Sequence, residues 1–484
     1  MSLVEKLAEN STVINSKGGE YYDTTYSANL DMFCMIARKM SDENIRRIFC
    51  NAYAENKQLA LANLLFILDI RDGKGERKIF KVCYKWLCIN DKESAIKIMN
   101  LIGELGRFDY LLVGLKTEIH KETIKLIETQ LLEDSQTEYP SLLAKWLPTR
   151  RRKNDELNYA RILCEDLKLT REQYRKTLSS IRKKLNLIET KLANKDYKIE
   201  FDKVPTKAML KYKQAFQRNC SEAYSEYITK ASKGEVKINT QGLFAYEIVK
   251  NIYNKGVHYI TKDERNLYNA MWEQQKNILK GCDKNVLVMA DTSGSMTWDT
   301  GLPIYSSIGL AIYIAERNTG AFKDYFMTFS SSPKLQKITG IDIVDKIKNI
   351  NCINDNTNID KAFQLLLDTA IKNNIPQEEM PSHIVIISDM EFDRGVYSKN
   401  STNLNGWKKA FDDYEYTLPK IIFWNVSKTI NGMPATKFSN DVAMISGFST
   451  AIFENILNIE NITPINIMLE KLKKYLEMLG VKYD

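Results

Sequence analysis

Histidine is scarce in this sequence. Its three histidines, His120, His258 and His383, stand far from one another among 484 residues. We therefore expect each to have a solvated or core role rather than a catalytic one. The eight cysteines form no Cys-x-x-Cys pair and have no histidine nearby. That pattern predicts reduced thiols and argues against zinc ligands or a disulfide framework.

Long apolar runs are missing as well. No run approaches the roughly 18 residues that a membrane-spanning helix needs, and the opening MSLVEKLAENS lacks the charged-then-apolar pattern of a signal peptide. We therefore expect a cytoplasmic protein that makes no membrane contact. A chain of 484 residues is too long for one hydrophobic core, so two or three domains are predicted.

Recognisable catalytic motifs are also missing. No serine or cysteine stands in a nucleophile elbow. The segment RDGKGER, residues 71–77, has the glycines and the lysine of a phosphate-binding loop but neither its spacing nor the hydroxyl after the lysine. We expect a turn between helices there. The protein is predicted not to be an enzyme, although a magnesium ion with an open position could in principle activate water.

What the sequence does contain is an uneven distribution of charge. Residues 1–280 hold 49 Lys and Arg against 37 Asp and Glu, whereas residues 281–484 hold 20 against 24. Residues 145–220 alone hold 21 basic against 9 acidic residues. An excess of this kind is a candidate surface for nucleic-acid phosphates.

Residues 1–280 have the pattern of an α-helical, repeat-like domain. Apolar residues recur at spacings of three and four, which predicts helices at Leu59–Asp69, Glu76–Cys88, Ser94–Leu105 and Ile119–Leu132. The clearest stripe predicts one helix of about 25 residues and consists of Tyr174, Leu178, Ile181, Leu185, Ile188 and Leu192. Its other faces carry cations, namely Arg171, Arg175, Lys176, Arg182, Lys183 and Lys184. Successive helical hairpins suit an α-solenoid, or HEAT-like, array.

Residues 281–484 alternate strands with helices instead. Strands are predicted at Val286–Ala290, Asp324–Ser330, Ile384–Ser388, Lys420–Asn425 and Val442–Ser446. Helices are predicted near Leu302–Arg317, Ile359–Ala370 and Ile462–Met478. This alternation predicts a doubly wound, Rossmann-like parallel sheet with right-handed crossovers, and places the domain boundary near residue 280.

Polar residues adjoin three of these elements at one edge of the predicted sheet. Asp291, Ser293 and Ser295 follow the strand VLVMA, Thr357 precedes a helix, and Asp389 ends the strand IVIIS. Ligands bind at the carboxyl edge of open α/β sheets, so these side chains can converge there on one cation. An all-oxygen set suits Mg²⁺ or Mn²⁺. The simpler alternative is that Asp291 or Ser293 merely caps a helix.

This constellation resembles the metal-ion-dependent adhesion site of von Willebrand factor type A domains, whose pattern is Asp-x-Ser-x-Ser, a distant Thr and then an Asp. The resemblance implies that Asp291, Ser293 and Ser295 coordinate directly, that Thr357 completes the shell, and that Asp389 acts directly or through water. We further predict an open coordination position for an acidic side chain of a protein partner. The alternative is a type A domain that keeps these residues but binds cation too weakly to matter.

A wider resemblance rests on several segments between Leu59 and Ser449. They are LLFILDIRDGKGERKIF, LGRFDYLL, LAKWLPTRRRKN, YRKTLSSIRKKLNLIE, VLVMADTSGSM, IVIISDMEFD, PKIIFWNV and VAMISGFS. Together they resemble the family called domain of unknown function 2828, which implies no established activity. The layout, a helical half followed by a type A domain, is also similar to that of Ro autoantigen (TROVE) proteins, which bind RNA ends and small structured RNAs.

Trp146 stands beside a run of cations, Arg150, Arg151, Arg152 and Lys153. Aromatic rings beside cations suit single-stranded nucleic acid, because bases stack while phosphates pair. The same pattern also fits a buried anchor followed by a solvated loop. With Arg171, Arg175, Arg182, Lys183 and Lys184, these residues form the candidate RNA-binding set.

Two functions follow from these features. The first is a Ro-like RNA-binding ribonucleoprotein component whose type A domain binds Mg²⁺ without catalysis; the charge imbalance favours it. The second is a metal-dependent protein–protein interaction scaffold without RNA, which the complete cation pattern favours.

Overall fold

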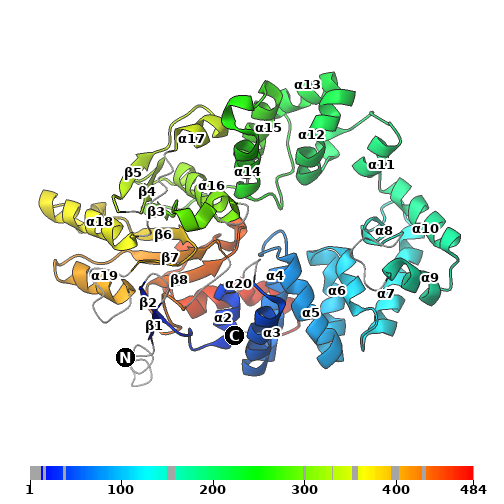
Figure 1. Cartoon of the computed structure of the whole chain (residues 1–484), viewed down its shortest axis with the longest axis horizontal. Helices are drawn as coiled ribbons and strands as arrows, with labels where there is room; N and C mark the ends of the chain where they lie inside the picture. Colours follow the sequence, from blue (N-terminus) through cyan, green and yellow to red (C-terminus); the bar gives the residue numbers. More distant parts are fainter. Residues whose placement is uncertain are drawn as a thin grey trace. The chain divides into compact units, whose positions relative to one another are not determined.

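The computed structural model describes residues 12–14, 18–35, 40–149, 158–297, 301–329, 331–350, 358–393, 403–427 and 432–482 (Figure 1). The chain divides into two compact units. Unit 1 comprises residues 1–63 and 228–484, and unit 2 comprises residues 64–227. Unit 1 therefore contains residues from both sides of residue 280, where the sequence pattern changes from helical to alternating strands and helices.

Unit 2 is helical. Its first boundary falls within α4 (Lys57–Leu68) and its last within α13 (Ser221–Ser232). Between them lie α5 (Arg77–Asn90), α6 (Lys92–Leu105), η1 (Phe108–Gly114), α7 (His120–Gln136), α8 (Leu143–Trp146), α9 (Tyr159–Asp166), α10 (Arg171–Lys184), α11 (Ile188–Ala193), η2 (Phe201–Lys203) and α12 (Thr206–Asn219). The four helices predicted between Leu59 and Leu132 are confirmed as α4 to α7. Residues 71–76 of the segment RDGKGER lie in the turn between α4 and α5, and its last residue, Arg77, begins α5.

The prediction of one helix of about 25 residues is wrong. The apolar stripe continues through two helices, α10 and α11, which Leu185, Asn186 and Leu187 separate. Asn186 adopts a left-handed conformation with φ 48°. Asparagine tolerates that conformation better than most residues, so the helix ends there although the apolar spacing persists.

Unit 1 begins with a short hairpin and helices. The antiparallel strands β1 (Thr12–Ile14) and β2 (Glu20–Tyr22) interrupt the helical pattern predicted for this half. The helices of unit 1 that precede its sheet are α2 (Ala28–Met35), α3 (Asp42–Glu55), the first part of α4, the last part of α13, α14 (Ala245–Lys255), η3 (Val257–Tyr259) and α15 (Lys262–Glu273). The described chain thus contains fourteen α-helices, α2 to α15, before its large sheet.

The sheet of unit 1 has six strands in the order β5-β4-β3-β6-β7-β8. They are β3 (Val286–Ala290), β4 (Tyr325–Thr328), β5 (Lys334–Lys337), β6 (His383–Ser388), β7 (Lys420–Asn425) and β8 (Val442–Ser446). All neighbours are parallel except β5, which runs antiparallel to β4 at the edge. The five predicted strands and the mostly parallel sheet are confirmed. The sequence did not indicate β5, because its four residues, KLQK, include one apolar side chain, Leu335, and no apolar alternation.

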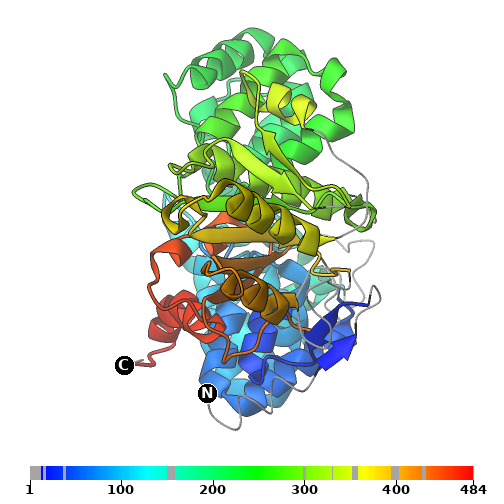
Figure 2. The ribbon, with the colours of Figure 1, turned by 90° about the vertical axis from the view of Figure 1, so that its left-hand side faces the viewer.

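Helices cover both faces of this sheet. They are α16 (Leu302–Arg317), α17 (Ile343–Asn349), α18 (Ile359–Asn373), α19 (Asn403–Asp412) and α20 (Pro464–Met478), with the short turns η4 (Gly294–Thr297), η6 (Gln377–Glu379), η7 (Thr450–Ile452) and η8 (Ile456–Asn458). Neighbouring residues of β7 point to opposite faces. Phe423 stacks with Trp407 of α19, whereas Trp424 stacks with Phe453 after η7. Figure 2 shows α18 and α19 in front of the strands.

The N-terminal segment packs against β8, the last strand of the sheet. Helix α2 contacts β8 and α20. The Ser446 hydroxyl donates to the carbonyl of Phe33 at 3.0 Å, and the Cys34 thiol donates to the carbonyl of Met444 at 3.5 Å. Residues near the start of the chain are therefore part of the α/β unit. No helix within the described ranges is long and apolar enough to cross a membrane.

Candidate metal centre

The strand order places two predicted ligands side by side. After β3 the chain turns toward β4, whereas β6 continues toward β7 on the other side, so the direction of winding changes between β3 and β6. Such a switch point opens a crevice at the carboxyl ends of the strands. Asp291 directly follows β3, and Asp389 directly follows β6, with Ala290 paired to Ile387. The structure thus brings Asp291 and Asp389 to adjacent strand ends.

Asp291 is completely buried. Its Oδ1 accepts a hydrogen bond from the backbone N–H of Ser293 at 2.9 Å, and its Oδ2 accepts one from the hydroxyl of Ser388 at 2.7 Å. Burial, reinforced by the nearby carboxylate of Asp389, raises the pKa of Asp291 to about 6. The folded chain therefore holds a carboxylate where its negative charge is poorly solvated.

The two serines of the motif lie next to this carboxylate. Ser293 is buried, and its hydroxyl lies 3.0 Å from the hydroxyl of Ser295. Ser295 belongs to η4, the short turn that follows β3. The turn explains the spacing of the motif, because it lets the two hydroxyls meet on the same side as Asp291.

The loop after β6 holds Asp389. Its Oδ1 accepts a hydrogen bond from the backbone N–H of Glu391 at 3.1 Å. The hydroxyl of Ser388, which donates to Asp291, lies 3.5 Å from the same oxygen and accepts from the N–H of Met390 at 3.1 Å. Ser388 therefore connects the two carboxylates. The sequence patterns did not single out Ser388. A serine at the end of an apolar strand, directly before Asp389, is the feature that could have indicated it.

Thr357, the fifth predicted ligand, lies outside the described residues. The next residue, Asn358, caps α18 by accepting a hydrogen bond from the N–H of Lys361 at 3.1 Å. The predicted helix after this loop is thus present.

The donor set fits a hard cation. Asp291, Asp389, Ser293 and Ser295 offer only oxygen atoms, which Mg²⁺ and Mn²⁺ prefer. Within the described ranges neither carboxylate forms a salt bridge with Lys, Arg or His. In the same ranges, no group of three or more His, Cys, Asp or Glu residues is placed to hold a metal ion. Two buried carboxylates without a cationic side chain are costly, and a bound divalent cation would offset that cost.

The candidate RNA-binding cations of α10 fall into two groups. Arg171, Arg175 and Lys183 are exposed. Arg182 donates to the carbonyls of Ala144 and Leu147, at 2.7 and 2.8 Å, where α8 ends. Lys184 donates to two carbonyls at the end of α7, Ser135 and Thr137 at 2.6 and 3.0 Å. The second group therefore stabilises helix ends within unit 2.

Trp146 already has a cation on one face. The guanidinium carbon of Arg107 lies 3.6 Å from the centre of a Trp146 ring. Asp109 fixes this guanidinium through two hydrogen bonds of 2.9 Å. That face of the half-buried indole is therefore covered. Residues Arg150, Arg151, Arg152 and Lys153 lie outside the described residues.

Two of the three histidines, His120 and His383, have local partners. Nε2 of His120 lies 3.1 Å from a carboxylate oxygen of Asp166. His383 is buried at the start of β6 beside the Ser382 hydroxyl; burial, with Lys420 and Lys284 nearby, lowers its pKa to about 4. The seven described cysteines are free. Cys352 lies outside the described residues.

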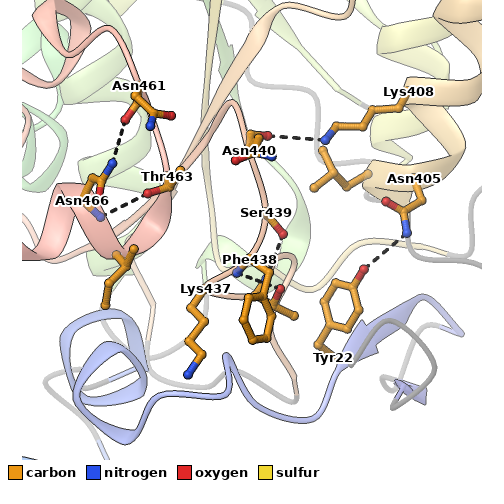
Figure 3. Close-up of a pocket in the computed structure, with 13 residues that line it drawn as sticks. Tyr22, Asn405, Lys408, Lys437, Phe438, Ser439, Asn440, Asn461, Thr463 and Asn466 are labelled. Carbon is orange, nitrogen blue, oxygen red and sulfur yellow. Dashed lines mark hydrogen bonds between the residues drawn. The ribbon is translucent and has the colours of Figure 1, made fainter. Parts of the chain in front are cut away.

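A cavity of about 540 Å³ lies elsewhere in unit 1 (Figure 3). It is lined by Tyr22, Leu404, Asn405, Lys408, Thr436, Lys437, Phe438, Ser439, Asn440, Asn461, Thr463, Ile465 and Asn466. Neither Asp291 nor Asp389 lines it. The candidate site lies at the two carboxylates, because both are buried and the Ser388 hydroxyl lies between them, whereas the cavity is lined mainly by neutral amides and hydroxyls.

Comparison with known proteins divides the chain near the change in its sequence pattern. Residues 124–284 match a family described as a domain of unknown function, DUF2828, and residues 285–475 match a second, DUF7788. The resemblance to the 2828 family inferred between Leu59 and Ser449 is therefore shared between two families, and the segments containing Asp291 and Asp389 lie in the second. The chain is also 29% identical over 511 residues to "Uncharacterized protein L728" of Acanthamoeba polyphaga mimivirus, which covers 95% of this chain and 86% of the relative. These similarities show distant homology, and none of the names states an activity.

Proposed function

We propose that the α/β part of unit 1 is a von Willebrand factor type A-like module that binds Mg²⁺, or Mn²⁺, and uses the cation to capture a carboxylate of a protein partner. One observation carries this proposal. Asp291 and Asp389 lie at adjacent strand ends at the point where winding reverses, and the hydroxyl of Ser388 connects them. The strand order supports the assignment, because it corresponds to a doubly wound sheet.

Each residue has a defined part in this proposal. Asp291, Ser293 and Ser295 hold the cation directly, Thr357 completes the shell, and Asp389 acts directly or through water. The bound cation supplies a positive charge at the mouth of the crevice. Ser388 and the backbone N–H of Ser293 orient the carboxylate of Asp291 by their hydrogen bonds. An oxygen-only site with an open position favours a partner's Asp or Glu side chain as the last ligand.

Calorimetry with Mg²⁺ and Mn²⁺ tests the metal site. Asp291→Asn keeps the side-chain shape and removes the charge, so it should abolish measurable binding. Asp360→Asn is a matched control, because Asp360 is also a buried aspartate of unit 1 and donates no ligand in this proposal. Equal affinity in the wild type and Asp291→Asn would exclude the site.

The capture of a carboxylate predicts a cation-dependent complex. A protein complex isolated on the wild-type chain should dissociate in EDTA, re-form with Mg²⁺, and fail to form with Asp291→Asn. Metal-dependent hydrolysis of RNA, phosphoesters or peptides that Asp389→Ala abolishes would instead establish an enzyme and contradict this proposal.

RNA binding by unit 2 is a second candidate function. Arg171 and Arg175 support it, because they lie exposed one turn apart at the start of α10 in the most basic segment of the chain. The layout similar to Ro proteins points to a single-stranded end or a small structured RNA as the ligand. In this proposal the RNA-binding and cation-binding sites lie in different units and act independently.

A further inference from the structure

The loop that holds Asp389 is fastened by a residue near the start of the chain. The phenol oxygen of Tyr21, on β2, donates a hydrogen bond to the carbonyl of Met390 at 2.8 Å and accepts one from the N–H of Phe392 at 3.0 Å. Tyr21 is 3% exposed, and its ring stacks on that of Phe392 with centroids 6.4 Å apart. One side chain thus satisfies two backbone groups of the loop directly after Asp389.

The neighbouring backbone continues the same contact. Gly18 forms an antiparallel bridge with Asp393, and Tyr22 forms one with Met433. Gly432 adopts φ 111°, and a Cβ at this position would lie 2.5 Å from Cβ of Tyr21. A residue without a side chain is therefore required where this segment passes Tyr21.

The loop from Asp389 to Phe392 contains a residue in an unfavourable backbone conformation. Met390 adopts φ 66°, a left-handed conformation that is uncommon for a residue with a long side chain. Both Met390 and Phe392 are buried. Their backbone groups need partners in place of water. Ser388 supports the loop from the strand side through the N–H of Met390, and Tyr21 supports it from the opposite end.

We propose that Tyr21 is a positioning residue for the cation site, which holds the loop from Asp389 to Phe392 in the conformation that presents the Asp389 carboxylate. The inference rests on the cation site proposed above. Loss of the Tyr21 hydroxyl removes the hydrogen bonds that hold the backbone of Met390 and Phe392. The loop then becomes ordered only when the cation binds, and this ordering costs part of the free energy of binding. Affinity for Mg²⁺ therefore falls, while the rest of unit 1 remains folded.

The experiment compares Tyr21→Phe with Tyr22→Phe. Tyr22 is the matched control because it is the next residue of β2, is 2% exposed, and accepts a hydrogen bond through its hydroxyl from Asn405 on α19 at 3.3 Å, away from the loop (Figure 3). Both variants keep the aromatic ring and lose one hydroxyl. A general loss of stability would therefore affect both alike.

Two measurements on the full chain separate the possible results. Without cation, hydrogen exchange of a peptide that covers residues 389–393 should be faster in Tyr21→Phe than in the wild type and Tyr22→Phe. Calorimetry with Mg²⁺ should show affinity about 3- to 10-fold weaker in Tyr21→Phe only, which is less than the loss typical of groups that contact a ligand side chain directly.

Three other results would contradict the proposed role of Tyr21. Unchanged exchange in Tyr21→Phe overturns the positioning role whether or not the cation binds. Faster exchange with unchanged affinity shows that the fastening does not serve the cation. A wild-type chain that binds no Mg²⁺ or Mn²⁺ overturns the proposed metal function, and with it the role of Tyr21 toward a cation, even if the exchange result holds.

Discussion

The hydroxyl of Ser388 donates to the Oδ2 atom of Asp291 at 2.7 Å, from one strand end to the next. This hydrogen bond joins the last residue of β6 to the first residue after β3, which are 97 positions apart in the chain. It fixes one oxygen of a fully buried carboxylate, while the backbone N–H of Ser293 fixes the other. The geometry of the proposed cation site therefore depends on a residue that is not itself a predicted ligand.

Replacing Ser388 with Ala should lower the affinity for Mg²⁺ by about 10-fold, because partners that orient a metal ligand commonly contribute this much. Ser306→Ala is the matched control, since the buried hydroxyl of Ser306 donates to the carbonyl of Leu302 within α16. Calorimetry at constant pH measures both variants. Similar affinity in Ser388→Ala and the control would show that Asp291 needs no orientation by Ser388.

Asp360 should stabilise the packing of α18 on α19. Its Oδ1 accepts a hydrogen bond from Nε1 of Trp407 at 2.6 Å, and both residues are buried. Asp360→Ala leaves this donor unsatisfied and should lower the free energy of unfolding by about 1–3 kcal/mol. Asp360→Asn retains an acceptor and should lose less. Thermal unfolding of the two variants without cation tests this order, and a larger loss in Asp360→Asn would contradict it.

His383 should make stability fall under mildly acidic conditions. Burial lowers the pKa of His383 to about 4 from an ordinary value of 6.5. Between these pH values the unfolded chain binds a proton that the folded chain does not, so stability decreases as pH falls from about 6.5 toward 4. At pH 5 the decrease amounts to about 2 kcal/mol relative to neutral pH.

The variant His383→Asn isolates this contribution. Urea unfolding at pH 7.5 and pH 5.0 should show that the wild type loses about 2 kcal/mol more than the variant on acidification. Asp291 titrates in both proteins, so its opposite effect cancels from the difference. The same loss in both proteins would mean that His383 is protonated in the folded state at pH 5.

RNA binding by unit 2 should depend on the exposed arginines of α10. Reversing Arg171 and Arg175 to Glu should weaken binding to a single-stranded RNA, and reversing the exposed Arg46 and Arg47 of α3 provides a control with the same change of charge. If about five phosphates are contacted, the logarithm of the wild-type affinity should fall with log salt at a slope near −3.5. The α10 variant should flatten this slope, whereas Asp291→Asn should not. Equal binding by the α10 variant and the control would reject this surface.

The carboxyl-edge geometry could be predicted from the sequence because it follows from local rules. The strands β3 and β6 are apolar almost throughout, and an aspartate directly follows each of them. Parallel strands present their carboxyl ends at one edge, so the meeting of Asp291 and Asp389 needs no knowledge of distant contacts. Ser388 and Tyr21 could not be selected in the same way. Their importance arises from hydrogen bonds across 97 and 371 positions, and no spacing rule indicates such pairs.

For the basic segment, the sequence could not tell which cations are exposed and which have partners within the protein. A count of charges treats Arg175 and Arg182 alike, but the first is exposed and the second holds the end of α8. Likewise, the cation nearest to the centre of the Trp146 ring among the described contacts is Arg107 at 3.6 Å, against 5.8 Å for Lys145, and Arg107 lies outside the basic run that drew attention to the tryptophan. Composition therefore located a basic surface without identifying which of its cations remain available to a ligand.

The discontinuity of unit 1 bears on how the protein is made. Residues 64–227 form a compact unit whose segments are neighbours in sequence, so this part can fold soon after it leaves the ribosome. Tyr21, by contrast, must wait for Phe392, 371 positions later. At ordinary translation rates that interval is on the order of 20 to 70 seconds. During this time β2 and α2 lack the sheet on which they finally pack, and a chain terminated before β6 would present them permanently without their partners.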